Sequence, residues 1–174
     1  MTIIRVVDLD LTVFAFISNY LSSSNEGDGL PLFPAAVATI KTWLSKGDTV
    51  LFCSRSKRIN VCRRALAGAG IDLDDHPHVI HHTPNGSKSM HFALIRSLMP
   101  LDNAHLYDDD TSILSEARQF FPVENIHVVN PDSGLGYRGV DTEPLALPSL
   151  QIIANRHGYA LSAYDADMIS FSKL

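Results

Sequence analysis

Short apolar runs alternate with amphipathic stretches along most of the chain. The runs predict β-strands, because they are short and apolar, and the first of them, IIRVV, is rich in β-branched residues. They cover residues 3–7, 49–54, 76–82, 104–107 and 125–129. The stretches between them predict helices, because their apolar residues recur at intervals of three and four. They cover residues 35–46, 57–69, 87–99 and 112–120.

This alternation is typical of an α/β domain. We therefore predict a Rossmann-like parallel sheet of about five strands between layers of helices. The length of 174 residues suits one domain, with its core in residues 1–140. The pattern weakens beyond Asn130, where GLGYRG is expected to be a loop and 148–174 to hold a helix and an extended piece. The role of the extension 141–174 stays open.

Composition narrows the class of protein. An apolar fraction of 45% and a charged fraction of 19% predict a folded globular chain. The net charge of −5 argues against a chain-wide basic surface for nucleic acid. No apolar run approaches the ~20 residues that span a membrane, and the start of the chain has no signal-peptide pattern. The two cysteines, Cys53 and Cys62, make no disulfide framework, so we expect a cytoplasmic setting.

Polar side chains gather where the predicted strands end. In a doubly wound sheet, ligands bind at the carboxyl ends of the strands. The polar residues at these ends, or in the loops just after them, are Asp8, Asp10, Ser54, Arg55, Lys88, Asp108 and Asp109. Buried strand ends are poor places for unpaired carboxylates, so several converging acids need a cation. Oxygen-only ligands indicate Mg²⁺.

The spacing within DLDLT indicates how the first acids are used. Side chains two apart in an extended segment point the same way, so Asp8 and Asp10 can address one substrate. Two carboxylates in different surroundings can divide the nucleophile and acid/base roles. Thr12 adds a hydroxyl, and Lys88 would stabilise a transferring phosphoryl group. Each motif alone is weak, because a DDD run is usually a solvated turn or a helix start. Their order along the chain favours a functional site.

Four segments resemble the motifs of the haloacid dehalogenase (HAD) superfamily. They are VVDLDLTVF (6–14), CSR (53–55), GSK (86–88) and LYDDD (106–110). Within that superfamily, the chain most resembles the small magnesium-dependent phosphatases, over roughly residues 1–140. One departure is Leu11, which stands where many members have glycine.

The resemblance implies a phosphatase, a phosphoric monoester hydrolase. Asp8 would attack phosphorus and become an aspartyl-phosphate. Asp10 would protonate the leaving oxygen and then activate the hydrolytic water. Ser54 and Lys88 would hold the phosphoryl oxygens, with Lys88 also orienting Asp8, and Thr12 would steady the first motif.

The resemblance also implies a set of magnesium ligands. Mg²⁺ would sit on the Asp8 carboxylate, the Asp10 main-chain carbonyl and Asp108, with Asp109 assisting directly or through water. The run of three acids leaves open whether Asp109 or Asp110 assists. We choose Asp109 because the first two acids directly follow the predicted strand.

The spacing leaves no room for the cap domain that usually gives these enzymes selectivity. About twenty residues separate Thr12 from the helix start near Pro34, and 33 lie between Ser54 and Lys88. An open site suits a phosphosugar, a phosphoprotein or a nucleic-acid end. The loop 13–33 can act as a small lid, because its glycines and serines permit movement.

Two other functions remain open. A nucleic-acid 3′-phosphate phosphatase would need a basic track, whose candidates are Arg55, Lys57, Arg58, Arg63 and Arg64. A non-catalytic phosphate-binding or assembly module would keep the fold without the chemistry. Loss of Asp8 or Asp10 would have favoured that module, and both are present.

Three features have alternative interpretations. Arg55 either contacts the substrate or forms a surface salt bridge. His91 follows Lys88 by three residues and is either near the site or, as we favour, a structural hydrogen bonder. The histidines in 76–82 are more typical of a partly exposed strand than of a transition-metal site.

Overall fold

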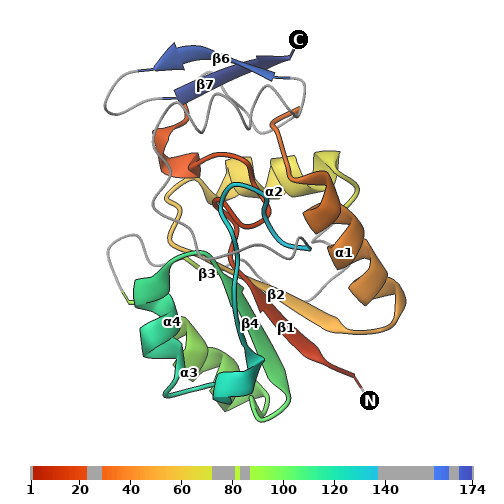
Figure 1. Ribbon diagram of the computed structural model, residues 1–174, viewed down its shortest axis with the longest axis vertical. Helices are drawn as coiled ribbons and strands as arrows, with labels where there is room; N and C mark the ends of the chain where they lie inside the picture. The colour runs from red at the N-terminus through yellow and green to blue at the C-terminus, as the bar shows by residue number, and fades with distance from the viewer. Residues whose placement is uncertain are drawn as a thin grey trace.

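The computed structural model describes residues 2–22, 29–71, 81–82, 87–136, 159–164 and 169–173. Its main feature is a parallel sheet in the order β3-β2-β1-β4-β5, which confirms the predicted α/β class (Figure 1). The strands are β1 (Ile4–Val7), β2 (Thr49–Ser54), β3 (His81–His82), β4 (Ala104–Asp108) and β5 (Ile126–Val128). Of the third predicted strand, 76–82, only the two residues of β3 are described.

Among the described residues, four helices cover the sheet. They are α1 (Pro34–Ser45), α2 (Ile59–Gly68), α3 (Ser89–Leu98) and α4 (Thr111–Ala117), with short 3₁₀ turns η1 (Ser18–Tyr20) and η2 (Val123–Asn125). Figure 1 shows α1 and α2 on one side of the sheet and α3 and α4 on the other. Each helix falls within or beside the range that its apolar spacing predicts.

The end of the chain differs from the prediction of a helix and an extended piece over 148–174. The described residues there form two antiparallel strands, β6 (Tyr159–Tyr164) and β7 (Ile169–Lys173). Apolar and polar residues alternate along Ile-Ser-Phe-Ser, which is the period of a strand with one covered face. The predicted helix would fall in 148–158, outside the described residues.

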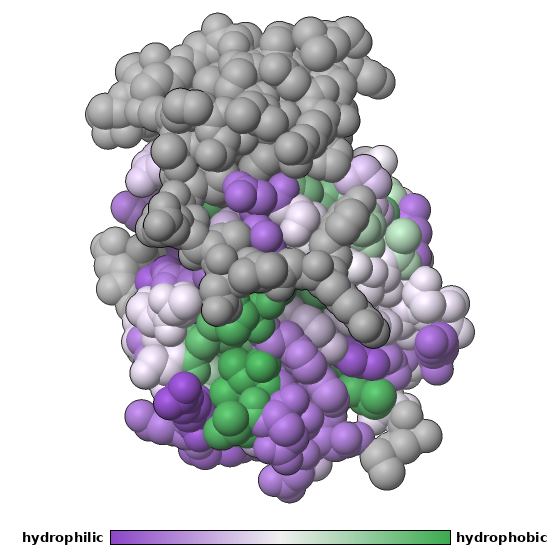
Figure 2. Space-filling view, in the orientation of Figure 1, coloured by the Kyte–Doolittle hydropathy of each residue, from purple (hydrophilic) through white to green (hydrophobic). Residues whose placement is uncertain are grey.

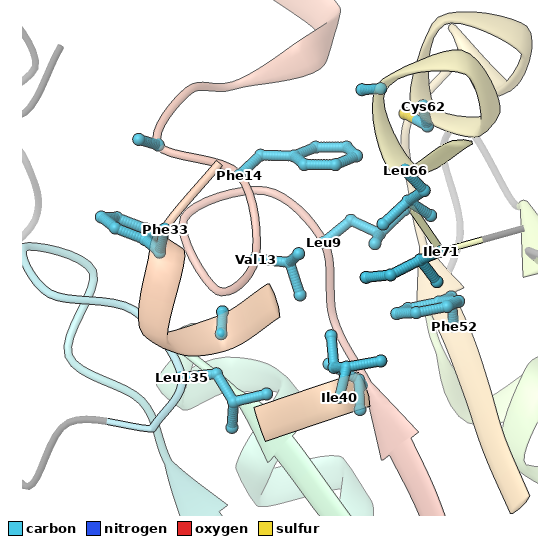
Figure 3. Packing of buried hydrophobic residues seen from close by; sticks show 14 of the residues in the cluster. Leu9, Val13, Phe14, Phe33, Ile40, Phe52, Cys62, Leu66, Ile71 and Leu135 are labelled. Carbon is cyan, nitrogen blue, oxygen red and sulfur yellow. The ribbon is translucent and has the colours of Figure 1, made fainter. Parts of the chain in front are cut away.

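The sheet is buried on both faces, and neighbouring residues of a strand serve opposite faces. Val7 and Phe52 join α1 and α2 in one hydrophobic cluster, whereas Val6 and Leu51 join α3 and α4 in the other. Figure 3 shows the first cluster, which also contains Leu9, Val13, Phe14, Phe33, Ile40, Cys62, Leu66, Ile71 and Leu135. The two cores together hold the carboxyl ends of the strands in fixed positions.

The outer face of α3 is apolar as well. Met90, Leu94 and Leu98 are exposed and follow one another at intervals of four residues, which places them on one side of the helix. In Figure 2 hydrophobic residues form a patch in the lower half of the view, where Figure 1 labels α3, α4 and β4. Within the described residues, no helix combines the length and the apolar character needed to cross a bilayer.

The loop after β1 is tied down by main-chain hydrogen bonds. The Leu9 carbonyl accepts from three amides, those of Thr12, Val13 and Phe14. The Thr12 carbonyl accepts from the Leu135 amide at 2.8 Å, so the segment after β5 packs against this loop. Gly134, with φ +73°, makes the turn that presents Leu135. A methyl group there would lie 2.2 Å from the Phe33 ring.

Replacing Gly134 therefore tests this contact. We expect Gly134→Ala to lower the free energy of unfolding by about 1–2 kcal/mol for the left-handed backbone. The clash with Phe33 should cost about 1–3 kcal/mol more. Gly47 has φ +83° and open space around it, so Gly47→Ala should show only the backbone cost. Urea unfolding of both variants measures the difference, and equal losses would contradict the close packing against Phe33.

Candidate active site

The sheet brings the predicted site residues to one place. Val7 of β1 lies beside Tyr107 of β4, so Asp8 and Asp108 follow at neighbouring strand ends. Ser54 ends β2 on the other side of β1. A pocket of about 430 Å³ opens here. It is lined by Asp8, Asp10, Leu11, Ile17, Asn19, Ser54, Arg55, Lys88, Asp108, Asp109 and Asp110.

Lys88 lies at the centre of the charged groups. It is the N-cap residue of α3 and is only 2% exposed. Its Nζ donates to Asp8 Oδ1 at 2.6 Å and to Asp108 Oδ2 at 2.7 Å. Burial alone would lower the pKa of Lys88, but the Asp108 and Asp8 carboxylates outweigh it and raise the pKa. The lysine is therefore held charged.

Three carboxylates surround a space that suits a cation. Oxygens of Asp8, Asp108 and Asp109 all lie within 4.8 Å of one another. Burial and the Asp8 charge raise the pKa of Asp108 to about 7 and that of Asp109 to about 9. Lys88 thus does not fully offset the effect of burial and of neighbouring charge on these acids. An all-oxygen donor set of this kind could hold Mg²⁺.

Thr12 joins two of these acids. Its hydroxyl lies 3.1 Å from Asp8 Oδ2 and 3.4 Å from Asp109 Oδ1, and its side chain is fully buried. Asp8 consequently accepts from Lys88 on one oxygen and from Thr12 on the other. Both oxygens of the predicted nucleophile are thereby fixed in direction.

Asp10 has different surroundings. Its Oδ2 accepts from Ser18 Oγ at 3.0 Å, while its Oδ1 is buried without a hydrogen-bond partner among the described residues. Burial, with the charge of Asp8, raises the pKa of Asp10 to about 7. A carboxyl group with such a pKa can give up and take back a proton near neutral pH.

Asp110 does not join the acidic cluster. Its Oδ1 accepts from the Ser112 amide at 2.9 Å, which caps α4, and its Oδ2 pairs with Arg55 at 2.7 Å. Burial would raise the pKa of Asp110, but the hydrogen bonds from Ser112 and from Arg55 outweigh it and lower the pKa. The geometry therefore favours Asp109 as the companion of Asp108.

Ser54 and Arg55 differ in how they meet the pocket. Ser54 is 1% exposed, and its Oγ accepts from the Ser56 amide at 3.0 Å. Arg55 lines the pocket but is engaged in the exposed pair with Asp110. Of its two predicted interpretations, the salt bridge is the one that the structure contains.

Sequence reasoning missed several residues of the site. Ser18 and Ser56 are buried beside Asp10, and Ile17 and Asn19 line the pocket. No motif marks them, because their positions depend on how the loop after β1 folds back. Leu11 is the other surprise, since its φ of +60° makes it the one non-glycine residue with positive φ in the described parts of the chain. That backbone explains why glycine suits this position.

The other residues that the sequence singled out have contacts or burial typical of residues that stabilise the fold. Arg58 donates to the main-chain carbonyls of Leu21 and Ser22, the latter at 2.7 Å. His91 is buried on α3. Cys53 and Cys62 are free and buried, and burial raises the pKa of each thiol to about 12, which suits core residues. The histidines 76, 78, 81 and 82 have no described side chains.

Lys88 offers a test of the buried charges in protein freed of metal by a chelator. We expect Lys88→Met to lower the free energy of unfolding by about 3–5 kcal/mol near pH 8.5, because two buried carboxylates lose their partner. The loss should shrink near pH 5.5. Without Lys88 the pKa of Asp108 rises further, so acid restores its neutral form in the variant and the penalty disappears below that pKa.

The exposed pair provides the matched control. Arg55→Met breaks a contact of the same 2.7 Å length to Asp110, but both side chains are partly exposed. It should change stability by no more than about 1 kcal/mol at either pH. Urea unfolding at the two pH values measures the free energy of unfolding of the wild-type protein and of both variants. A loss for Lys88→Met that did not depend on pH would contradict the buried cluster.

Comparison with known proteins identifies the fold. A scan against protein-family models and a search of curated proteins found no match. Among solved structures, the chain is similar to the N-terminal part of a Bacteroides fragilis protein, which contains a phosphatase domain complexed with Mg. The TM-score is 0.59 at 14% identity, and the match covers 77% of this chain but only 38% of that one.

A second likeness is to the HAD domain of the effector protein Lem4 from Legionella pneumophila. The TM-score is 0.51 at 14% identity, over 74% of this chain and 85% of that chain. At such identities the likeness concerns the fold. The parallel sheet of this chain, flanked by helices on both faces, is that of a HAD-like core.

Proposed function

We propose that the protein is a magnesium-dependent phosphomonoester hydrolase that forms an aspartyl-phosphate on Asp8. The observation that carries the proposal is the group formed by the buried Lys88, Asp8 and Asp108 with the partly buried Asp109. Beside it, one oxygen of Asp10 has no partner among the described residues. The solved B. fragilis neighbour with a phosphatase domain and Mg supports it.

In the first step, an Asp8 oxygen attacks phosphorus. The bond between phosphorus and the ester oxygen breaks, and that oxygen leaves with its electron pair. Asp10 gives it a proton, so the products are the alcohol and a phosphorylated Asp8. The hydrogen bonds from Lys88 and Thr12 hold the Asp8 carboxylate in a fixed direction for this attack.

In the second step, a water molecule attacks the same phosphorus. It loses a proton to Asp10, which the first step has left ionised, and the bond between phosphorus and Asp8 breaks. Inorganic phosphate leaves, and both aspartates return to their starting states. A pKa of about 7 for Asp10 suits a group that is acid in one step and base in the next.

Two residues would hold the phosphoryl oxygens. Lys88 uses two of its three N–H donors on Asp8 and Asp108, which leaves one for the substrate. The Ser54 hydroxyl oxygen accepts from the Ser56 amide, so its own proton can be donated to a phosphoryl oxygen. Both would stabilise the charge that spreads over these oxygens in the transition state.

The residues present fit a magnesium ion. The carboxylates of Asp8, Asp108 and Asp109 would hold it, together with the Asp10 main-chain carbonyl. When bound, Mg²⁺ would offset the charge of these acids and of the transferring phosphoryl group. The raised pKa values of Asp108 and Asp109 support this fit, because they indicate a group that is short of positive charge.

The substrate belongs to the class of phosphomonoesters, with a phosphosugar and a phosphoprotein as the first candidates. A nucleic-acid end is less favoured, because two members of the predicted basic track, Arg55 and Arg58, are engaged within the protein. Absence of a cap domain stays a prediction from the sequence. A panel of phosphosugars, phosphotyrosine peptides and 3′-phosphate oligonucleotides would distinguish these classes.

The activity itself is tested with an activated aryl phosphate. We expect release of phosphate that requires Mg²⁺ and falls by at least about a thousandfold in Asp8→Asn, because the amide is not a nucleophile. Asp102→Asn is the matched control, since Asp102 is an exposed carboxylate outside the pocket. It should keep the full rate. If the wild-type protein and Asp8→Asn were equally inactive on every ester, the proposal would be wrong.

Metal binding is tested separately from activity. We expect Mg²⁺ to raise the unfolding midpoint. The free energy of unfolding should rise by about 2.7 kcal/mol when the ion is at a hundred times its dissociation constant. Asp109→Asn should lose most of this gain. Asp110→Asn should keep it, because Asp110 lies outside the cluster and asparagine also caps a helix. The opposite result would assign Asp110 to the metal.

A further inference from the structure

Two buried serines form a hydrogen-bonded chain that ends on Asp10. Ser18 Oγ lies 3.0 Å from Asp10 Oδ2 and 2.5 Å from Ser56 Oγ. Ser18 has no exposed surface and Ser56 is 1% exposed. Neither is among the site residues that the sequence predicts. Buried hydroxyl groups of this kind must find partners within the protein.

Counting protons fixes the direction of the chain. A serine hydroxyl has one proton to donate. The Arg58 amide already donates to Ser56 Oγ at 3.0 Å, so the Ser56 proton is available for Ser18. Ser18 in turn gives its single proton to Asp10, which has no donor when it is ionised. With Asp10 ionised, the order is therefore Ser56 to Ser18 to Asp10 Oδ2.

This order serves Asp10 in both of its protonation states. When Asp10 is ionised, Oδ2 accepts from Ser18. When Asp10 carries a proton on Oδ1, Oδ2 is a carbonyl oxygen and still accepts from Ser18. The two serines thus keep their hydrogen bonds in both states. Oδ1 has no partner among the described residues and is left as the oxygen that can exchange the proton.

The serines are themselves held by a second link. The Lys57 amide donates to Asn19 Oδ1 at 2.7 Å, one residue along from each serine. This hydrogen bond joins η1, which lies in the segment between β1 and α1, to the turn that follows β2. The Ser56 amide also donates to Ser54 Oγ. One turn therefore supports both the proposed proton donor and a proposed phosphate ligand.

We infer that Ser18, supported by Ser56, is a positioning residue that fixes the Asp10 carboxyl group for proton transfer to the leaving oxygen. The inference rests on the proposed function. Ser18 is not among the residues that line the pocket, and the described hydrogen bonds of its hydroxyl go to Asp10 and Ser56. Its loss should therefore affect the proton transfer and leave phosphate binding unchanged. A poor leaving group needs that proton, whereas a good leaving group departs without it.

The experiment compares Ser18→Ala with the wild-type protein on two esters. We expect kcat/KM for an alkyl phosphate to fall by about 10- to 100-fold, and that for an activated aryl phosphate by less than about threefold. The binding constant for inorganic phosphate should not change. Ser56→Ala should act in the same direction with a smaller effect, and it serves as the second variant if Ser18→Ala folds poorly.

Two controls separate positioning from a general structural effect. Ser97→Ala removes an exposed hydroxyl from α3 and should leave both rates unchanged. In an Asp10→Asn background, Ser18→Ala should cost less than about twofold on either ester, because the group that it positions is already gone.

The outcomes separate the inference from the proposed function. Equal losses on the two esters, or the same loss in the Asp10→Asn background, would overturn the positioning role while hydrolysis by Asp8 stood. A wild-type protein that released no phosphate from any ester would overturn the proposed function, and the inference with it.

Discussion

The buried Lys88 ammonium group, held between Asp8 and Asp108, is the contact on which the arrangement of the site depends. Parallel strands end side by side, so acids that follow β1 and β4 are forced into proximity within a buried region. One lysine partly offsets their repulsion and does not remove it, as the raised pKa values of Asp108 and Asp109 indicate. The same imbalance, which costs stability, is the basis for the cation and the phosphoryl group that we propose for this site.

The backbone around this cluster is also held under strain. Leu11 has a φ of +60°, a conformation that costs a residue with a side chain about 1–2 kcal/mol. The three amides that converge on the Leu9 carbonyl, and the Leu135 amide on the Thr12 carbonyl, stabilise it. This turn presents Asp8 and Thr12 to the acids at the end of β4. The strain therefore lies where the proposed site needs the Asp8 carboxylate to be held in one orientation.

The fold and the acidic part of the site follow from local patterns. Apolar periodicity predicts the strands, and strand ends in a parallel sheet gather whatever residues follow them, which is why Asp8, Lys88 and Asp108 could be expected together. The assignment of Asp109 over Asp110 rests on which carboxylate caps α4. The Ser18–Ser56 contact could not be predicted, because it joins two loops that no periodicity describes.

Asp8 and Asp10 lie two residues apart, and their surroundings make them different groups. Asp8 accepts a charged donor on one oxygen and a hydroxyl on the other. Asp10 accepts one hydroxyl, and its other oxygen is buried with no partner among the described residues. Burial raises its pKa and so favours its neutral form. The same side-chain type thus has different partners at the two positions, which is the basis for the two roles that we propose for Asp8 and Asp10. The difference comes from Lys88 and Ser18, which the two loops supply.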